Sequence, residues 1–283
     1  MSISEDRNFD PITEHFAKKV YGGLKGEIRL AVLKRDLTDV VKQLSAQNNR
    51  PLRILDVGAG LAQISIALAE QGHQVTINDI SHNMLVEAKK YARERGVLEK
   101  ITWLVCPYQQ FEQTLADTFT DTFADSFSNA PAETKAEGYD LILCHALLEW
   151  LGQPSDIMPF FARWLAADGV LSLCFYNPAS FVYRNLIMGN FNLLNNPEFK
   201  SDNKKSLTPN NPVSYEQVAG WLEEQGLQIN SISGLRVFHD YAPLKRGGHS
   251  NPEAVIEMEL RYSNQTPYKW LGRYLHVLAQ HKD

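Results

Sequence analysis

Two acids and two glycines lie at a spacing that could hold a nucleotide. Asp56, Gly58 and Gly60 belong to or follow the apolar run 53–57, and Asp79 ends a second apolar run (79 − 56 = 23 residues later). The glycines allow a tight turn close to a ligand, and the first N–H groups of a helix expected over 62–71 face that turn. An acid ending the second strand can accept hydrogen bonds from ribose hydroxyls. The pattern predicts a nucleotide-binding half-domain, with a ligand-free strand, turn and helix as the alternative.

The residues of the turn favour a cationic nucleotide over a dinucleotide. Gln63 stands where a dinucleotide fingerprint has its third glycine. Asp56 would repel a phosphate but suits a ligand with an amine and a sulfonium. The run resembles motif I of class I S-adenosylmethionine-dependent methyltransferases, hhhDxGxG. That resemblance implies cofactor contacts from the backbone of Gly58 and Ala59 and from the Asp79 carboxylate, with Asp56 ordering the turn.

Composition is typical of a cytoplasmic globular protein. The chain has 283 residues, of which 44% are hydrophobic and 22% charged, and no apolar run approaches the ~18 residues of a membrane span. The polar, acidic N-terminus is not a signal peptide. Cys106, Cys144 and Cys174 lie in or beside apolar runs and read as small core residues, so we expect no metal site. Residues 112–138 carry a charge of −6 + 1 = −5, equal to the whole chain, so an anionic macromolecular partner is not excluded.

The alternation of elements predicts an α/β fold in a single domain, 1–283. Strands are expected at 53–57, 74–78, 101–105, 139–144 and 169–176, and helices at 62–71, 82–95, 155–166 and 214–225. Strand-like runs at 227–241 and 273–280 would form a closing antiparallel hairpin. The result is a Rossmann-like, mostly parallel seven-stranded sheet with an antiparallel last strand and ligands at the carboxyl ends of its strands. Residues 8–45 read as two helices broken at Gly22 and Gly23, forming a lid over the cleft.

Two segments interrupt this alternation. The acidic, low-complexity insertion at 113–138 contains a four-residue repeat that places Phe119, Phe123 and Phe127 on one helix face. We expect an exposed insertion, with a short amphipathic helix followed by a loop. Residues 177–212 read as a substrate-side insertion of Asn-rich and Lys-bearing turns after the fifth strand.

The resemblance extends over nearly the whole chain. The segments that carry it are Asp6–Asp10, Tyr21-Gly22, Lys25-Gly26, Arg29, His145–Trp150, Phe175–Asn177, Gly189–Phe191, Arg236–Tyr241, Glu259-x-Arg261-Tyr262 and Pro267–His276. Together they resemble the bacterial tRNA 5-carboxymethoxyuridine methyltransferase family. The resemblance implies methyl transfer to the carboxylate of 5-carboxymethoxyuridine at the tRNA wobble position. The chain departs from the family in its acidic insertion and in a shortened lysine run after Gly189–Phe191.

Carboxyl methylation makes modest chemical demands. A carboxylate with a pKa of ~4 is ionised at neutral pH, so we expect no catalytic acid or base. The protein must align oxygen, methyl carbon and sulfur and exclude water. An arginine can grip the acceptor carboxylate with two parallel hydrogen bonds. Arg236 is the first choice for this role, and the predicted pocket lining is Tyr176, Asn177, His239 and Tyr241. The alternatives are a strand-edge charge for Arg236 and a structural histidine for His239.

Four further residues are predicted at the cofactor. The resemblance places Arg29 against the cofactor carboxylate. Tyr108 and Gln109 follow the third strand, where a neighbour of the adenine ring is expected, and a plain turn is the alternative. His145 ends the fourth strand beneath the cofactor, with a core histidine as the alternative.

The anticodon arm of tRNA is the expected partner, bound by a monomer. Its phosphates would contact a basic surface formed by Arg184, Lys200, Lys204, Lys205, Lys245 and Arg246. A solvated loop face is the alternative for any one of them. Two other functions stay open: methyl transfer to a small carboxylic acid or quinone precursor, and a cofactor-binding module without turnover.

Overall fold

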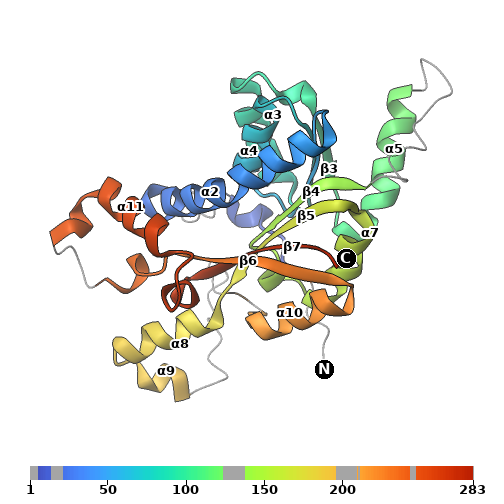
Figure 1. The fold of residues 1–283 in the computed structure, drawn as a ribbon. Helices are drawn as coiled ribbons and strands as arrows, with labels where there is room; N and C mark the ends of the chain where they lie inside the picture. Colours follow the sequence, from blue (N-terminus) through green and yellow to red (C-terminus); the bar gives the residue numbers. More distant parts are fainter. Residues whose placement is uncertain are drawn as a thin grey trace.

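Seven strands form one sheet in the order β3-β2-β1-β4-β5-β7-β6 (Figure 1). The computed structural model describes residues 6–13, 22–123, 138–195, 209, 211–242 and 247–282. The strands are β1 (Arg53–Val57), β2 (Gln74–Asp79), β3 (Ile101–Val105), β4 (Tyr139–His145), β5 (Leu165–Tyr176), β6 (Leu227–Leu235) and β7 (Tyr274–His281). β7 pairs antiparallel with β5 and with β6, whereas the other pairings are parallel. The predicted seven-stranded sheet with its antiparallel last strand is confirmed.

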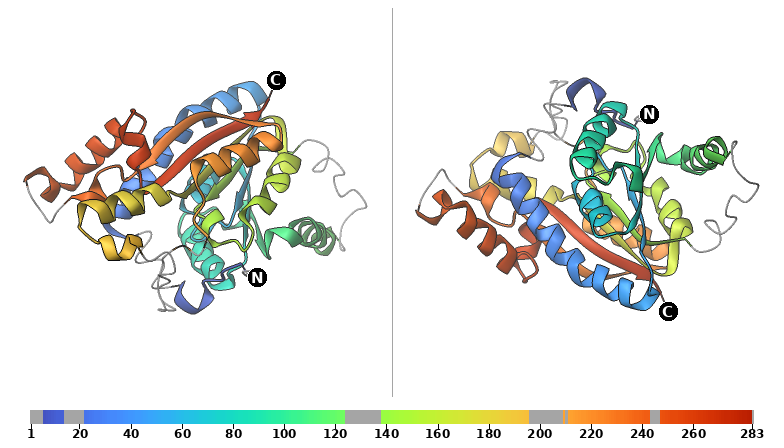
Figure 2. Two further views of the ribbon diagram at one scale, coloured as in Figure 1. Left: turned by 90° about the horizontal axis from the view of Figure 1, so that it is seen from below. Right: turned by 90° about the horizontal axis from the view of Figure 1, so that it is seen from above.

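Helices cover both faces of the sheet (Figure 2). One face packs against α2 (Gly23–Asn48), α3 (Gln63–Glu70), α4 (His82–Glu94) and α11 (Pro252–Tyr262). The opposite face packs against α5 (Phe111–Phe123), α7 (Met158–Trp164) and α10 (Tyr215–Glu224). The helices α8 (Pro178–Ile187) and α9 (Phe191–Asn195) follow the carboxyl end of β5. The carboxyl edge of the sheet therefore has its own covering elements, distinct from the two core layers.

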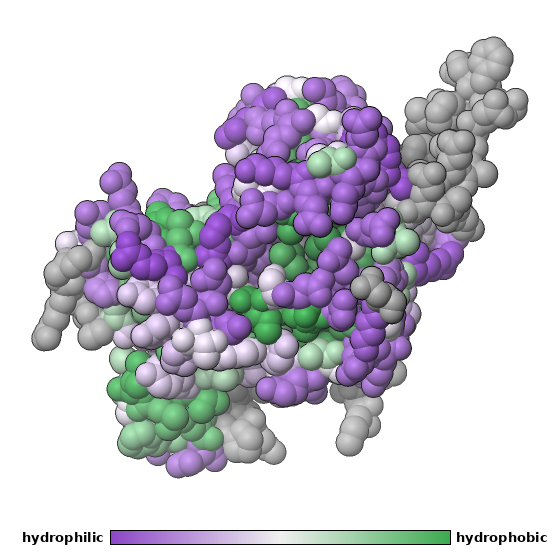
Figure 3. Space-filling view, in the orientation of Figure 1, coloured by the Kyte–Doolittle hydropathy of each residue, from purple (hydrophilic) through white to green (hydrophobic). Residues whose placement is uncertain are grey.

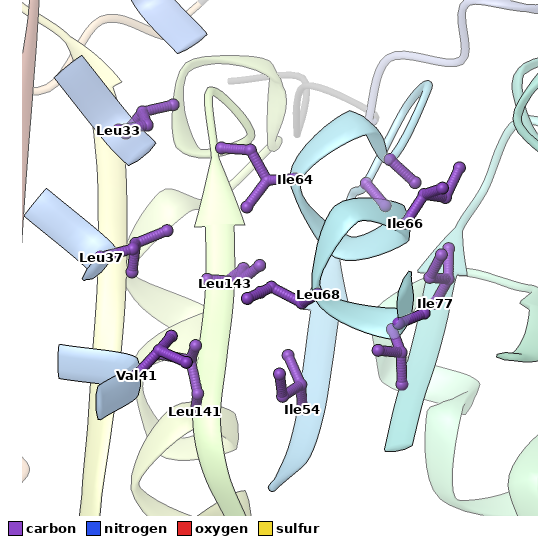
Figure 4. Close-up of a cluster of buried hydrophobic side chains, with 14 of the residues drawn as sticks. Leu33, Leu37, Val41, Ile54, Ile64, Ile66, Leu68, Ile77, Leu141 and Leu143 are labelled. Atoms are coloured by element: carbon purple, nitrogen blue, oxygen red, sulfur yellow. The ribbon is translucent and has the colours of Figure 1, made fainter. Parts of the chain in front are cut away.

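The core explains why α2 runs across the sheet. Leu33, Leu37 and Val41 recur every four residues on α2 and face Leu141 and Leu143 of β4 (Figure 4). All five are less than a tenth exposed. Full burial of such a side chain contributes about 1.5–3 kcal/mol, so this row fixes α2 against β4 and β5.

Several predicted boundaries are wrong, each for a local reason. The helix expected at 155–166 is a 3₁₀ turn, Pro154–Ile157, followed by α7, and β5 begins four residues before the predicted strand. The strand expected at 227–241 ends at Leu235, because Arg236 adopts a left-handed backbone with φ +60°. β6 and β7 are adjacent but are connected through α11 rather than by a hairpin. In the described part of the segment 177–212, the residues expected to form turns include the helices α8 and α9, and residues 196–208 and 210 lie outside the description.

The lid and the acidic insertion are described only in part. α2 begins at Gly23, which agrees with the predicted break, and a 3₁₀ turn at Asp10–Ile12 precedes it. α5 forms the start of the insertion and extends away from the sheet (Figure 1). Residues 124–137 of the insertion lie outside the described part of the chain. Among the described helices, none combines the length and apolar character of a membrane span.

Candidate functional site

A cavity lies at the carboxyl ends of β1, β2 and β4. Parallel pairing places Val57 beside Asn78 and Asp56 beside Leu143, so these strand ends meet at one edge. The lining residues are Asp6, Arg7, Phe9, Arg29, Val57, Gly58, Gly60, Asn78, Asp79, Ile80, Met84, Cys106, Pro107, Tyr108, His145, Ala146, Leu147, Trp150 and Leu151. A smaller adjoining cavity shares Arg29, Gly58 and His145 and adds Asp56 and Ala59. The arrangement matches the ligand position of an open α/β sheet.

The backbone amides of the turn at Gly58 and Ala59 are already hydrogen-bonded within the protein, which leaves carbonyl oxygens for a ligand. Gly58 N and Ala59 N both donate to Asn78 O, at 2.9 and 3.1 Å. Gly58 has a φ of +65°, and a Cβ there would lie 2.8 Å from Leu147 Cδ1. With these two amides already paired, the turn is a poor phosphate cradle. It suits a ligand that presents donors of its own.

Asp79 is buried and held by two backbone donors. Gly60 N and Ser81 N donate to Oδ2 and Oδ1, each at 2.7 Å. Burial raises the pKa of Asp79, and the two amides oppose that rise. Each carboxylate oxygen keeps one lone pair, so the group can still accept from two adjacent hydroxyls in the cavity.

Asp56 faces inward rather than into the main cavity. Ser65 Oγ on α3 donates to Asp56 Oδ2, and the side chain is buried. Burial raises the pKa of Asp56 to about 7, with the Ser65 hydrogen bond acting in the opposite direction. The carboxyl group ties β1 to α3 at the two ends of the turn.

The N-terminal segment closes one side of the cavity. Asp6 Oδ1 accepts from Gly152 N at 2.8 Å, and Arg7 lies over the ring of Trp150 at 4.9 Å. Asp6 Oδ2 accepts from Gln109 Nε2 at 3.1 Å. Gln109 is exposed and holds this segment from outside the lining, whereas Tyr108 lines the cavity. The predicted pair after β3 thus divides into a wall residue and a fastening residue.

Arg29 and His145 lie where the two cavities meet. Arg29 Nη2 donates to His145 O at 3.4 Å, and the guanidinium lies 5.3 Å from the Tyr274 ring centre. Both residues line both cavities. Burial lowers the pKa of His145 well below its usual value, and the charge of Arg29 adds to that effect. His145 is therefore neutral at pH 7, beside a buried cation.

A second cluster of arginines and tyrosines forms at the ends of β5 and β7. Antiparallel pairing sets Tyr176 opposite Tyr274, and their ring centres are 5.8 Å apart. Arg236 lies 5.4 Å from the Tyr274 ring, and Arg273 lies 4.9 Å from the Tyr176 ring. Because Arg29 also stacks on Tyr274, this cluster adjoins the cavity through one aromatic ring. Its cationic character suits an anionic substrate group.

A buried glutamate shapes the segment that carries Arg236. Glu259 on α11 accepts from the backbone N–H groups of Val237 and His239, at 2.7 and 2.9 Å, and from that of Phe238 at 3.2 Å. Arg236 is paired with Asp240 Oδ2 at 3.4 Å, and its side chain is 14% exposed. The grip of Glu259 therefore holds Arg236 and His239 at the same edge as Tyr176.

The other predicted substrate residues have structural partners. Tyr241 donates its hydroxyl to Leu271 O at 2.5 Å. Asn177 Nδ2 donates to Trp270 O and Gly272 O, both at 2.9 Å, and its Oδ1 accepts from Ala179 N. These bonds join the start of α8 to the turn before β7. His239 Nδ1 is buried and lacks a partner among the described residues.

The predicted basic surface is described only at Arg184. Arg184 is exposed on α8, and its Nε donates to Asp240 O at 3.4 Å. Lys200, Lys204, Lys205, Lys245 and Arg246 lie outside the described residues. The α8–α9 pair also presents an apolar surface (Figure 3). Its exposed members are Val182, Tyr183, Leu186, Ile187, Met188 and Phe191.

Sequence reasoning missed Glu149 and Arg273. Glu149 is fully buried, and within the described part of the chain neither carboxylate oxygen has a hydrogen-bond partner. Burial raises its pKa to about 7, against the opposing effects of nearby backbone amides and Arg29. Both residues belong to segments that carry the family resemblance, but the burial of Glu149 and the contact of Arg273 with Tyr176 arise only in the folded chain.

Sequence comparisons agree with this geometry. A family model described as "Methyltransferase domain" matches residues 30–232. The tRNA 5-carboxymethoxyuridine methyltransferase of Escherichia coli K12 is 39% identical over 276 residues, covering 98% of this chain and 97% of its own. The ubiquinone biosynthesis O-methyltransferase of Pseudoalteromonas translucida is 26% identical over 74% of this chain and 75% of its own.

Solved structures show the same fold. Magnesium protoporphyrin IX methyltransferase from Synechocystis PCC 6803, with bound SAH, aligns at a TM-score of 0.54 and 15% identity, covering 97% of this chain and 96% of its own. Its SAM-bound form aligns at a TM-score of 0.53.

Proposed function

The chain belongs to the methyltransferase family that includes the tRNA 5-carboxymethoxyuridine methyltransferases, and we propose that it methylates the carboxylate of 5-carboxymethoxyuridine at the tRNA wobble position. The observation that carries the proposal is the 39% identity over 98% of the chain. That match extends past residue 232, where the general methyltransferase domain ends. Arg236, Glu259, Arg273 and Tyr274, which build the second cluster together with Tyr176, lie in this additional part.

The main cavity fits S-adenosylmethionine, which supplies a methyl group activated by its sulfonium. The buried Asp79 carboxylate has lone pairs left for the ribose hydroxyls. The Asn78-paired amides leave no phosphate cradle, and Arg29 supplies a cation for the amino-acid carboxylate. Tyr108 provides an aromatic wall at the adenine end. Trp150 and the segment around Asp6 exclude water from the same space.

Substrate binding falls to the second cluster. The acceptor carboxylate is already ionised, so the protein has no proton to remove before the oxygen can react. Arg236 grips the carboxylate, and Tyr176, His239 and Tyr241 line the space for the base. Asn177 contributes by fixing the turn that carries Trp270 and Gly272. Rate enhancement then comes from alignment and from exclusion of water.

The substrate-side segment 177–212 provides the tRNA contacts in this proposal. Arg184 and the lysines at 200, 204 and 205 would meet anticodon-arm phosphates, together with Lys245 and Arg246. The exposed Tyr183 and Phe191 give bases of the loop an aromatic surface on which to stack. In this proposal the enzyme is a monomer and acts in the cytoplasm.

A second candidate is methyl transfer to a small carboxylic acid or quinone precursor. The 26% identity to a ubiquinone biosynthesis O-methyltransferase favours it. That likeness covers a smaller share of the chain, and a small substrate would leave Arg184 and the lysine-bearing segments without a role. The tRNA substrate therefore accounts for more of the molecule.

Nucleoside analysis of tRNA from a strain that lacks this gene tests the proposal. We expect the methyl ester of 5-carboxymethoxyuridine to disappear and the free acid to accumulate. Re-expression of the chain should restore the ester, and an Asp79→Ala variant should not. Persistence of the ester at its normal level in the deletion strain would refute the proposal.

A further inference from the structure

A line of buried hydrogen bonds joins α2 to the cavity across three strands. His276 Nδ1 on β7 lies 2.8 Å from Asp36 Oδ2 on α2. Ser172 Oγ on β5 lies 2.8 Å from His276 Nε2 and 2.8 Å from His145 Nε2 on β4. Ser172 and His276 are at most 1% exposed. The only member of this line that reaches the cavity is His145.

The sheet register explains how the line forms. Ser172 pairs with Leu143, two residues before His145, and Cys174 pairs with both His145 and His276. Side chains two apart share a face, so His145, Ser172 and His276 all point toward α2. Leu33 and Leu37 of α2 pack over Leu143 on that face (Figure 4), which holds Asp36 in reach of His276. Helix and strands thus bring the four polar groups together within an apolar layer.

With one proton on each imidazole ring, the hydrogens along the line have fixed positions. Asp36 carries a low pKa: burial would raise it, but the hydrogen bond from His276 and the charge of Arg35 lower it overall. The carboxylate only accepts, so His276 holds its proton on Nδ1 and a neutral His276 has a lone pair on Nε2. Ser172 donates its one hydroxyl hydrogen to that lone pair. His145 must then donate its own Nε2–H to Ser172 Oγ.

A neutral His145 with its proton on Nε2 has a lone pair on Nδ1. The described residues provide no hydrogen-bond partner for His145 Nδ1, and this atom is not buried. It is therefore open to the cavities that His145 lines. Arg29, the predicted partner of the methyl donor's carboxylate, lies beside it. In the methyl donor, an ammonium group lies next to that carboxylate. A lone pair on His145 Nδ1 can accept a hydrogen bond from the ammonium group, whereas an N–H there would repel it.

We propose that Asp36, His276 and Ser172 set the tautomer of His145, so that its Nδ1 accepts a hydrogen bond from the ammonium group of the methyl donor. Asp36, His276 and Ser172 act as positioning residues and touch no substrate. The inference rests on the proposed use of the cavity by S-adenosylmethionine, but not on the identity of the methyl acceptor.

The isosteric variant Asp36→Asn should reverse the donor and acceptor roles in every hydrogen bond of the line. Arg35 donates to Oδ1 of Asp36, so the asparagine keeps its oxygen there and turns its amide toward His276 Nδ1. His276 must then carry its proton on Nε2 and donate to Ser172. Ser172 donates to His145 Nε2, and His145 moves its proton to Nδ1. The heavy atoms stay in place while the polarity at the cavity inverts.

Histidine ¹⁵N spectra of the full chain, with His145 assigned from a His145→Gln variant, read the tautomer directly. We expect Nε2–H in the wild type and Nδ1–H in Asp36→Asn, with S-adenosylmethionine affinity at least about 10-fold weaker by calorimetry. The control Asp39→Asn removes an exposed acid from the same helix and should change neither. An Nδ1–H tautomer in the wild type, or an unchanged His145 in Asp36→Asn, overturns the inference.

Ser172→Ala provides an independent arm if Asp36→Asn does not fold. It interrupts the line, so His145 should populate both tautomers, and adding Asp36→Asn should have no further effect on affinity. A fixed Nε2–H tautomer in Ser172→Ala would refute the inference. If the tautomer and affinity change as expected but the wild-type chain does not methylate tRNA, the proposed function fails and this inference stands.

Discussion

The cavity at the ends of β1, β2 and β4 and the cluster at the ends of β5 and β7 are built in different ways. The cavity takes its central contacts from one strand-turn-helix unit and the strand beside it, with Gly58, Asn78 and Asp79 held by short-range backbone bonds. The cluster depends on Glu259, 23 residues beyond Arg236 (259 − 236), and on the antiparallel entry of β7. The central residues of the first region lie within the match to the general methyltransferase domain, residues 30–232, whereas Arg236, Glu259 and Tyr274 of the second region lie beyond it.

Removal of Asp79 should have the largest effect, and only on the first region. The Asp79→Ala variant loses two charged hydrogen bonds to the ribose and leaves Gly60 N and Ser81 N unpaired. We expect S-adenosylmethionine affinity to fall about 100-fold or more by titration calorimetry. The exposed control Asp39→Ala should bind normally. Wild-type affinity in Asp79→Ala would show that the cavity is not the cofactor site.

Glu149 lies between the regions and should make stability depend on pH. Its pKa rises from 4.5 to about 7 in the folded state, so between these values the folded protein holds a proton that the unfolded chain has lost. Stability from this group is present below pH 4.5 and is lost as the pH rises to about 7, by up to about 3 kcal/mol.

Urea unfolding of wild type and Glu149→Gln from pH 5 to pH 8 measures this contribution. The stability of the variant relative to wild type should increase across that range and level off above pH 7. The control Glu87→Gln, an exposed acid, should keep a constant difference. A constant difference for Glu149→Gln would mean that Glu149 is already ionised when buried.

Arg236→Lys should separate the two regions. The lysine keeps the charge but loses the planar fork that grips a carboxylate. We expect kcat/KM for tRNA to fall about 10- to 100-fold, while affinity for S-adenosylmethionine changes less than about twofold. Arg261→Lys is the matched control, because Arg261 is exposed and pairs with Glu257. Equal losses in both measurements would mean that the regions are not independent.

Glu259→Gln tests how the second region is assembled. A glutamine has one acceptor oxygen for three backbone donors, so the Arg236–Tyr241 segment loses part of its support. We expect unfolding free energy to fall by about 1–3 kcal/mol and methylation of tRNA to weaken, with cofactor affinity retained. Glu257→Gln on the same helix should be neutral. Unchanged tRNA methylation in a less stable Glu259→Gln would separate the segment from substrate binding.

The contrast also explains what could be predicted from sequence. The strand order, the turn at Gly58 and the position of Asp79 follow from local periodicity and spacing. Arg29 was placed by the family resemblance, and Tyr108 and His145 by their positions at the ends of the third and fourth strands; all three line the cavity. The pairing of the Gly58 and Ala59 amides with Asn78 O could not be read from the turn, because it depends on the neighbouring strand.

The second region was harder because its contacts join distant segments. Nothing in the 227–241 run shows that Arg236 adopts positive φ, since Glu259 imposes that shape from another helix. Arg273 contacts Tyr176 only because the start of β7 pairs with the end of β5. Likewise, Asp36 and His276 are 240 residues apart, and only the sheet register brings them together.

The proposed reaction is methyl transfer to the carboxylate of 5-carboxymethoxyuridine at the wobble position of tRNA. The most direct test incubates the purified chain with methyl-labelled S-adenosylmethionine and tRNA that carries 5-carboxymethoxyuridine, followed by nucleoside mass spectrometry. We predict label in the methyl ester of that nucleoside, released by mild alkali because esters hydrolyse. Label in an alkali-stable nucleoside, or no label in tRNA while the cofactor still binds, would contradict the claim.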